Sequence, residues 1–347
     1  MYPNAPRSKV TIKDVARACG VSTQTISRVL NNRSDVSPAT REKILAVIDQ
    51  MAYQPSALAR GLRQPSNTLG VIIAGLKYKG ISTTLKGIAQ ASEARGFALI
   101  LKELPTFGPM DMSPLIQSLM AHQVQGIIYA APEVGENWLS ARRALTRNAP
   151  PMVFLKGNPS AAPMTISIDN FAGGYMLTKR LIELGYRHIA HICGPLEWWE
   201  SRERRRGWQE ALRDAGRDVP EEACLEGDWS PAGGLDRYDR LKSLYPAMDA
   251  VFAGNDQMAL GVLHGAWRDG VNVPEALGVA GFDDLSEAAF FTPALTTVRQ
   301  DFHKPGELAV RKLMVLAGLC ENDPEVEPSA IILEPSLVER ASTAKTG

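Results

Sequence analysis

Apolar residues in the first fifty positions recur at helical spacing in three short segments. Thr11 and Asp14 predict the cap of a helix that begins at Ile12 and ends before Gly20. Ser22 precedes the second segment, and Ser37-Pro38 begins the third. Three short helices joined by tight turns predict a helix-turn-helix domain, whose second helix would enter the major groove of DNA.

The second segment, residues 21–31, has one apolar and one polar side. Ile26, Val29 and Leu30 share the apolar stripe. The other side carries hydroxyl, amide and guanidinium groups, on Thr23, Gln24, Ser27 and Arg28. These groups suit base edges and phosphates, although a merely solvated helix face would have the same pattern.

A short segment, Ser56 to Arg63, follows the three helices and has too little apolar surface to fold alone. Gly61 weakens it further as a helix. It is either a plain linker or a hinge that becomes helical only on DNA. A hinge helix would bring Leu58 and Leu62 to the minor groove, where an apolar side chain can open a base step.

From Thr68 onward, short β-branched or apolar runs alternate with helical segments, which predicts an α/β body of doubly wound parallel sheets. The runs are Leu69–Ala74, Ala98–Leu101, Gly126–Ala130, Met152–Leu155, His188–Cys193, Ala250–Ala253 and Leu277–Phe282. There are too many for one sheet, so we expect two halves divided near 157–164, with a late helix at about 304–318. Two such sheets make a cleft at their strand ends, which is a usual place for a small ligand.

Charge is distributed unevenly although the net charge is zero: residues 1–63 contain ten Lys or Arg and four Asp or Glu. A basic head suits contact with a polyanion, while an acidic body stays detached from it. The four cysteines are scattered, which predicts no zinc site, and no metal or cofactor is expected. Without an apolar signal region or a membrane-spanning run, a cytoplasmic location is expected.

Motifs for catalysis are missing from the sequence: it has no dinucleotide or phosphate-binding glycine loop, no nucleophile elbow and no His-Glu-x-x-His. His188 and His191, three apart on a strand, would point to opposite faces. Asp283 and Asp284 could form an acid and base pair, but one carboxylate accepting sugar hydroxyls is the simpler use. We therefore expect a protein that is not an enzyme.

Polar and aromatic residues follow the expected strands or begin the expected helices. They are Arg204, Trp229, Asn255, Asp283, Gln300 and Phe302. Aromatic faces suit the C–H side of a sugar, and the charged and amide groups suit its hydroxyls. Each has a plainer alternative, such as core packing for Trp229, a helix cap for Asn255 and solvated surface for Arg204.

Several longer motifs resemble the lactose/galactose repressor family over essentially the whole chain. They are Val10–Asn31, Val36–Lys43, Gly227–Ser230, Asn255–Gly261, Gly281–Asp284 and Thr296–Phe302. The resemblance implies a homodimeric transcriptional repressor with a periplasmic-binding-protein-like body, whose chain crosses three times between two subdomains. It divides the chain into a head (1–54), a hinge (55–66) and a regulatory and dimerisation domain (67–347). We expect one subdomain at about 67–163 plus 300–325 and the other at about 164–299 plus 326–347.

The resemblance also implies roles for individual residues. It implies DNA contacts by Thr11, Ser22, Thr23, Gln24, Ser27, Arg28, Asn31, Thr40, Leu58 and Leu62. It implies a small carbohydrate effector bound by Tyr78, Lys156, Trp198, Arg204, Trp229, Asn255, Asp283, Gln300 and Phe302. The partners would be a near-palindromic operator, this effector and a second copy of the chain, with no membrane.

Three departures from the lactose repressor argue against a galactoside effector. Lys156 replaces an acid, Trp198-Trp199 precedes Arg204, and Tyr129 replaces an amide. A tryptophan in that loop resembles family members that sense β-linked disaccharides, so a cellobiose-like glycoside is expected. Lys156, with Lys77 and Lys79, instead allows a sugar acid or sugar phosphate. A sugar-binding transport protein is a further alternative. The tail after Val338 has no apolar heptads, which favours a dimer over a tetramer.

Overall fold

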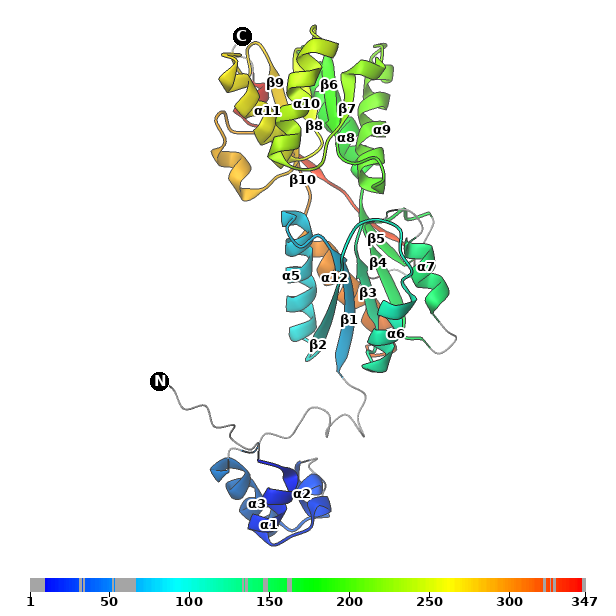
Figure 1. Cartoon of the computed structure of the whole chain (residues 1–347), viewed down its shortest axis with the longest axis vertical. Coiled ribbons are helices and arrows are strands. Elements are labelled where there is room, and N and C mark those ends of the chain that lie inside the picture. The colour runs from blue at the N-terminus through cyan, green and yellow to red at the C-terminus, as the bar shows by residue number, and fades with distance from the viewer. Residues whose placement is uncertain are drawn as a thin grey trace. The chain divides into compact units, whose positions relative to one another are not determined.

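The computed structural model describes residues 10–30, 33, 35–51, 53, 67–132, 134, 137–145, 149–160, 164–320, 323–324, 326 and 329–344. The chain divides into two compact units, a head (1–66) and a body (67–347) (Figure 1). Asn31, Leu58, Leu62 and the whole expected hinge, 55–66, lie outside the described residues. Within the described part of the chain, no helix is long and apolar enough to cross a membrane.

The head contains the three expected helices, α1 (Ile12–Cys19), α2 (Thr23–Leu30) and α3 (Pro38–Gln50). Thr11 and Asp14 form a reciprocal capping box at the start of α1, and Gly20 ends this helix in the left-handed conformation at φ +69°. The Ser22 hydroxyl accepts a hydrogen bond from the backbone N–H of Thr25 at the start of α2, and the Ser37 hydroxyl accepts one from that of Thr40 at the start of α3. The buried core comprises Val15, Ala16, Cys19, Ile26, Val29, Ile44 and Tyr53. These local signals confirm the three predicted helices.

The first lobe of the body is built on a parallel sheet of order β11-β5-β4-β3-β1-β2. Its strands are β1 (Thr68–Ala74), β2 (Ala98–Leu104), β3 (Ile127–Ala130), β4 (Met152–Leu155), β5 (Thr165–Ile168) and β11 (Ile331–Leu333). Its helices are α5 (Lys79–Glu93), α6 (Ser113–Ala121), α7 (Asn137–Ala144) and α12 (His303–Leu316). Val71 and Ile73 belong to the core under α5 and α12, whereas Ile72 packs with α6 on the other face.

The second lobe repeats this plan with a sheet of order β12-β10-β9-β8-β6-β7, in which only β12 is antiparallel. Its strands are β6 (Ile189–Cys193), β7 (Cys224–Glu226), β8 (Ala250–Ala253), β9 (Gly278–Asp283), β10 (Thr296–Arg299) and β12 (Ser336–Val338). Its helices are α8 (Asn170–Glu183), α9 (Trp199–Asp214), α10 (Pro231–Leu244) and α11 (Asp256–Arg268). The expected class, a helix-turn-helix head with an α/β body, is therefore confirmed.

The chain passes between the lobes three times, as the resemblance implied: from β5 to α8, from β10 to α12 and from β11 to β12 (Figure 1). The expected boundaries near 164 and 326 were wrong, because they put β5 and β11 in the second lobe. Both strands pair in the first sheet, with Ile331 opposite Ile166. The expected break at 157–164 therefore falls between two strands of the first sheet, β4 and β5.

Candidate functional sites

One face of α2 in the head is exposed and polar. Thr23, Gln24 and Arg28 are exposed and Ser27 is half-buried, whereas Ile26 and Val29 of the same helix are buried. The side chains of Thr23 and Gln24 make no hydrogen bond with the described residues. Arg28 forms a solvated ion pair with Asp35 at 3.5 Å, which is weak enough to exchange for another anion. Thr23 and Gln24 therefore keep their side-chain donors and acceptors available.

Other predicted DNA-contacting residues have local structural roles. The Thr11 hydroxyl donates to Asp14 at 2.6 Å, and the Ser22 hydroxyl caps α2. The half-buried Thr40 hydroxyl lies 2.8 Å from the hydroxyl of Ser37. These residues hold the helix starts, where backbone N–H groups attract anions, so a phosphate contact remains compatible with capping.

A cleft of about 800 Å³, counted up to its open mouth, lies between the two lobes of the body. Its polar and aromatic lining comes from strand ends and helix starts. Lys156, Asp283 and Gln300 lie at the carboxyl ends of β4, β9 and β10, and Trp198 and Asn255 precede the first turns of α9 and α11. A crevice at the carboxyl ends of parallel strands is the usual ligand site of such sheets.

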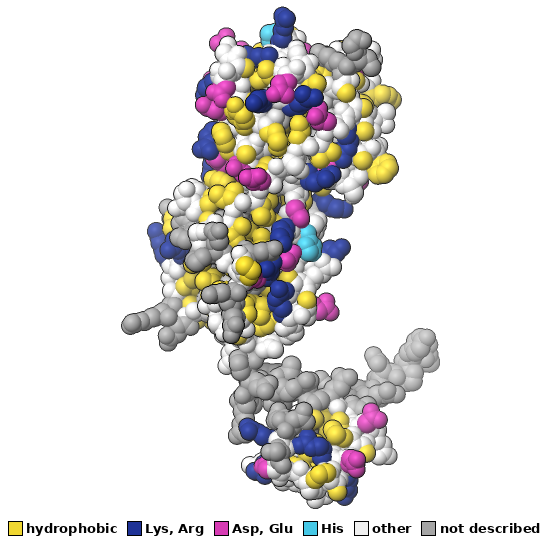
Figure 2. Space-filling model, turned by 180° about the vertical axis from the view of Figure 1, so that it is seen from behind, with side chains coloured by type: hydrophobic (Ala, Val, Ile, Leu, Met, Phe, Trp, Pro, Cys, Tyr) yellow, Lys and Arg dark blue, Asp and Glu magenta, His cyan; other side chains and the backbone are white. Residues whose placement is uncertain are grey.

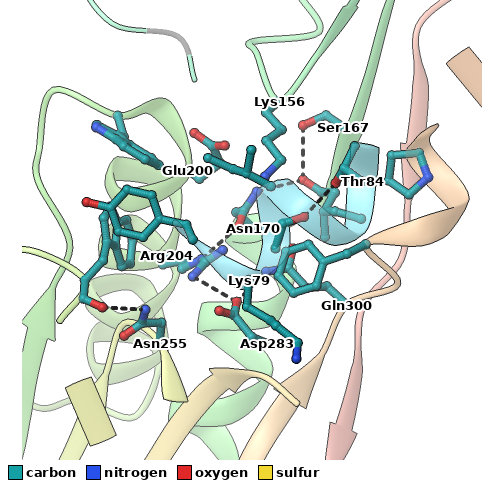
Figure 3. Close-up of a pocket in the computed structure, with 18 of the residues that line it drawn as sticks. Lys79, Thr84, Lys156, Ser167, Asn170, Glu200, Arg204, Asn255, Asp283 and Gln300 are labelled. Atoms are coloured by element: carbon teal, nitrogen blue, oxygen red, sulfur yellow. Dashed lines mark hydrogen bonds and ion pairs between the residues drawn. The ribbon is translucent and has the colours of Figure 1, made fainter. Parts of the chain in front are cut away.

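Arg204 and Asp283 form a buried ion pair in this cleft, with 3.7 Å between the guanidinium Nη1 and the carboxylate Oδ1 (Figure 3). Arg204 also donates to Asn170 at 2.9 Å and to the carbonyl of Gly254 at 2.6 Å. Gln300 donates to Asp283 at 2.5 Å. Burial raises the pKa of Asp283, but Arg204 and the Gln300 hydrogen bond oppose that shift. The two charges are thus fixed in place before any ligand arrives.

An aromatic cluster joins the two lobes beside the ion pair. Trp198 of the second lobe lies 6.0 Å from Tyr78 and 4.9 Å from Phe107, ring centre to ring centre, and both partners belong to the first lobe. Trp198 also contacts Trp229 at 5.6 Å. Gly194 leaves room for Trp229, because a Cβ there would lie 2.0 Å from the indole ring. The indole N–H of Trp229 is buried and has no hydrogen-bond partner among the residues that the structure describes.

A second pair of opposite charges lines the cleft. Lys156 lies after β4 with its ammonium 5.5 Å from the ring centre of Phe302, and the buried Glu200 lies in the first turn of α9. Burial lowers the pKa of Lys156, while the charges of Glu200 and Asp283 raise it. At the rim, Lys79 forms an ion pair with Glu287 at 3.6 Å across the two lobes.

Backbone strain concentrates at this cleft. Lys156, Trp229 and Asp283 all have positive φ angles, of +60°, +69° and +119°. Non-glycine residues in this region cost about 1–3 kcal/mol each, and such residues cluster at ligand sites. The surrounding fold holds these three residues in strained conformations, which is a common feature of ligand sites.

All nine residues predicted to bind an effector line the cleft, namely Tyr78, Lys156, Trp198, Arg204, Trp229, Asn255, Asp283, Gln300 and Phe302. Asn255 also serves as the expected helix cap, accepting the Met258 N–H at 2.8 Å and donating to the Trp229 carbonyl at 3.1 Å. The lining also includes residues that sequence reasoning missed, among them Thr84, Ser167, Asn170, Glu200 and Gln257. Glu200 could have been found, because it lies four residues before Arg204 on one helix face.

Other residues considered from the sequence lie elsewhere. Tyr129 is buried in the core of the first lobe beside Phe154, so its difference from the lactose repressor does not reach the cleft. Lys77 is exposed, with its ammonium 5.1 Å from the ring centre of Tyr78. Asp284 is bound by Arg299 and Arg340 and so does not act with Asp283. Among the described residues, no cluster could hold a metal ion.

A helix-turn-helix head joined to a two-lobed body with a ligand cleft defines a ligand-controlled DNA-binding regulator. Residues 11–56 match bacterial regulatory proteins of the lacI family, and residues 178–343 match a periplasmic binding protein-like domain. The chain is 34% identical over 337 residues to the ribose operon repressor of Escherichia coli strain K12, covering 96% of this chain and 99% of that repressor. The chain therefore belongs to the lacI family and is a DNA-binding transcriptional repressor, not an enzyme.

Two solved structures resemble this one over nearly the whole chain. The lac repressor dimer bound to operator and the anti-inducer ONPF has a TM-score of 0.87 and 28% identity, covering 97% of this chain and 100% of that one. The complex of the transcriptional regulator CelR with cellobiose has a TM-score of 0.70 and 30% identity, covering 96% and 100%. Both likenesses include the head and the body.

Proposed function

We propose that this repressor binds a near-palindromic operator as a homodimer and controls carbohydrate-utilisation genes in response to a neutral β-linked disaccharide or glycoside. The observation that carries the effector class is the cleft, where paired charges lie beside an aromatic cluster. Aromatic rings suit the C–H faces of sugar rings, and fixed charged groups suit their hydroxyls.

Charge balance in the cleft favours a neutral ligand over a sugar acid or phosphate. Arg204 is paired with Asp283, Lys156 has Glu200 nearby, and Lys79 is paired with Glu287 at the rim. An anion would have to compete with these carboxylates for each cation. The similar CelR structure is a complex with cellobiose, a β-linked disaccharide, whereas the ribose operon repressor, with 34% identity, is named for a monosaccharide.

The DNA-binding role is assigned to the exposed face of α2. Thr23 and Gln24 would contact base edges, and Arg28 would contact either a base or a phosphate. Further contacts with bases or phosphates would come from Ser22, Ser27 and Thr40. Leu58 and Leu62 would act from the hinge. Effector in the cleft would close or reorient the lobes and shift the population between DNA-competent and free forms, by its differential affinity for the two.

Dimerisation is supported by apolar surface on the second lobe. Leu260 and Trp267 of α11 are exposed, and Phe290, at the end of the adjoining 3-10 helix Ser286–Phe290, is 86% exposed. These side chains would bury apolar area against a second copy, and the similar lac repressor structure is a dimer. A repressor that acts on DNA would work in the cytoplasm.

The test combines operator binding with calorimetry on the full chain, using cellobiose, glucose, gluconate and glucose 6-phosphate. Cellobiose should bind and change operator affinity. Asp283→Asn should weaken sugar binding by about 2–5 kcal/mol, because Arg204 is left without its buried partner, and should leave operator binding intact.

Asp236→Asn is the matched control, because Asp236 is an exposed carboxylate on α10. This variant should bind sugar like the wild type. Unchanged sugar affinity in Asp283→Asn would move the effector out of this cleft. Tighter binding of gluconate or glucose 6-phosphate than of cellobiose would replace the neutral effector with an anionic one.

A further inference from the structure

The cleft holds two pairs of opposite charges, and they differ in how far their hydrogen bonds are already used. Arg204 and Asp283 are bonded to Asn170, Gly254 and Gln300. The Lys156 ammonium donates no hydrogen bond to a described residue, and it lies over the face of Phe302 instead. Its three N–H donors are therefore available to a ligand.

The two pairs also lie apart within the cleft. Figure 3 shows Lys156 and Glu200 on one side of Arg204, and Asp283 and Asn255 on the other. Lys156 points into the cleft toward Asn170 and Glu200. A ligand that meets both pairs must extend along the cleft, past the aromatic residues that also line it.

A charge pair at this position is poorly explained by stability. The charges of Lys156 and Glu200 interact, but the two groups form no ion pair with each other and Lys156 is only half-buried, so they add little to stability. The left-handed backbone of Lys156, at φ +60°, is strained for a residue other than glycine. Recognition of a ligand accounts for both features.

We propose that Lys156 and Glu200 form a second sugar subsite, in which Lys156 donates to and Glu200 accepts from hydroxyls on the second ring of a disaccharide whose first ring lies at Arg204 and Asp283. This inference rests on the proposed function of the cleft. On this proposal, Lys156 and Glu200 make the cleft prefer a disaccharide to a monosaccharide, because a single ring at Arg204 and Asp283 would not contact Lys156.

The two members of this subsite belong to different lobes, since Lys156 follows β4 of the first lobe and Glu200 begins α9 of the second. A second ring bound between them joins the lobes. A monosaccharide would bind mainly through groups near Asp283 and would stabilise the closed cleft less. The difference between disaccharide and monosaccharide should therefore be larger in their effect on operator affinity than in their own binding affinities.

The experiment measures cellobiose and glucose affinity by calorimetry for the full-length wild type, Lys156→Met and Glu200→Gln. Loss of a hydrogen bond to a charged group should weaken cellobiose binding about 10- to 100-fold in each variant. Glucose binding should change less than about threefold. The double variant should lose little more than either single variant, because the two side chains act on one ring.

Lys86→Met and Glu210→Gln are the matched controls, because both residues lie on helices of the same two lobes and outside the cleft lining. Both should bind the two sugars like the wild type. Operator affinity and thermal unfolding of each variant report whether the fold is retained, and a second pair of variants, Lys156→Gln and Glu200→Asp, replaces any that fails to fold.

Equal losses for glucose and cellobiose would overturn the second subsite and leave the effector site standing, as would no loss for either sugar. Tighter binding of gluconate or glucose 6-phosphate in Glu200→Gln would show that Lys156 serves an anion. A wild type that binds no neutral sugar would instead contradict the proposed function, and the subsite with it.

Discussion

The polar face of α2 and the cleft of the body present similar chemical groups in opposite states. On α2, Thr23 and Gln24 are solvated and make no hydrogen bonds with the described residues. In the cleft, Arg204 and Asn255 are buried and already bonded. A surface that binds DNA can order its side chains on contact, whereas a pocket that selects one small molecule gains from groups fixed in advance.

The distribution of charge follows the same division. On the face of the body seen in Figure 2, Lys and Arg are interspersed with Asp and Glu, without a continuous basic area. The excess of basic residues lies in the head segment, residues 1–63. Attraction to DNA is thereby concentrated in the part that carries α2.

Salt should separate the two regions most strongly. If the paired heads neutralise about 6–10 phosphates, operator affinity should fall about 10³- to 10⁵-fold between 50 and 200 mM salt. Cellobiose affinity should change less than about threefold over this range, because the charges of the cleft are internally paired and largely buried. Fluorescence anisotropy with labelled operator and calorimetry with sugar measure the two slopes. Parallel slopes would contradict this contrast.

Gln24→Ala should have a smaller effect, confined to sequence preference. Loss of one amide contact to a base should cost about 1–3 kcal/mol on the preferred operator and flatten the preference at one base pair. Arg60→Ala is the comparison, because loss of a phosphate contact should weaken all operator sequences alike. Binding to a panel of single-base operator variants distinguishes the two. If both variants lose selectivity equally, Gln24 is not a base reader.

An effect on stability and not on binding should come from Asp256, a buried carboxylate behind the cleft that accepts hydrogen bonds from Thr297 at 2.5 Å and from the Leu285 N–H at 2.7 Å. Burial, followed by the charge of Asp283, raises the pKa of Asp256 well above its ordinary value. Between about pH 4 and that raised pKa, the folded state holds a proton that the unfolded state releases. The free energy of unfolding should therefore fall as pH rises, by up to about 1.4 kcal/mol per pH unit.

Asp256→Asn removes this titration, so urea unfolding of the wild type and the variant from pH 5 to 8 isolates it. The wild type should lose stability relative to the variant as pH rises. Curves that stay parallel would show that Asp256 is ionised in both states, and Asp236→Asn should leave the wild-type dependence unchanged.

Sequence reasoning was most successful where the cause is local. Thr11, Asp14 and Gly20 bound α1 through contacts within a few residues, so their pattern alone predicts the helix. The nine cleft residues came from resemblance and from their positions at strand ends. The alternation of strands and helices predicted two sheets without showing which strands belong to each.

The two wrongly assigned strands and the missed residue share one physical cause: their positions depend on contacts between distant parts of the sequence. β5 and β11 are only four and three residues long and pair across a wide separation in sequence, so periodicity could not assign them to the first sheet. The contact of Trp198 with Phe107 likewise depends on how the lobes meet. The position of Glu200 near Lys156 depends in the same way on how the lobes meet, although its spacing from Arg204 was visible in the sequence.

The three passages between the lobes also affect the order in which the protein can be made. The first lobe contains α12 (His303–Leu316) and β11 (Ile331–Leu333), so its sheet lacks an edge strand until synthesis is almost finished. The head forms a compact unit from one short segment, so it can fold as soon as it leaves the ribosome. The nascent chain is therefore able to form its DNA-binding unit well before the cleft that regulates it exists.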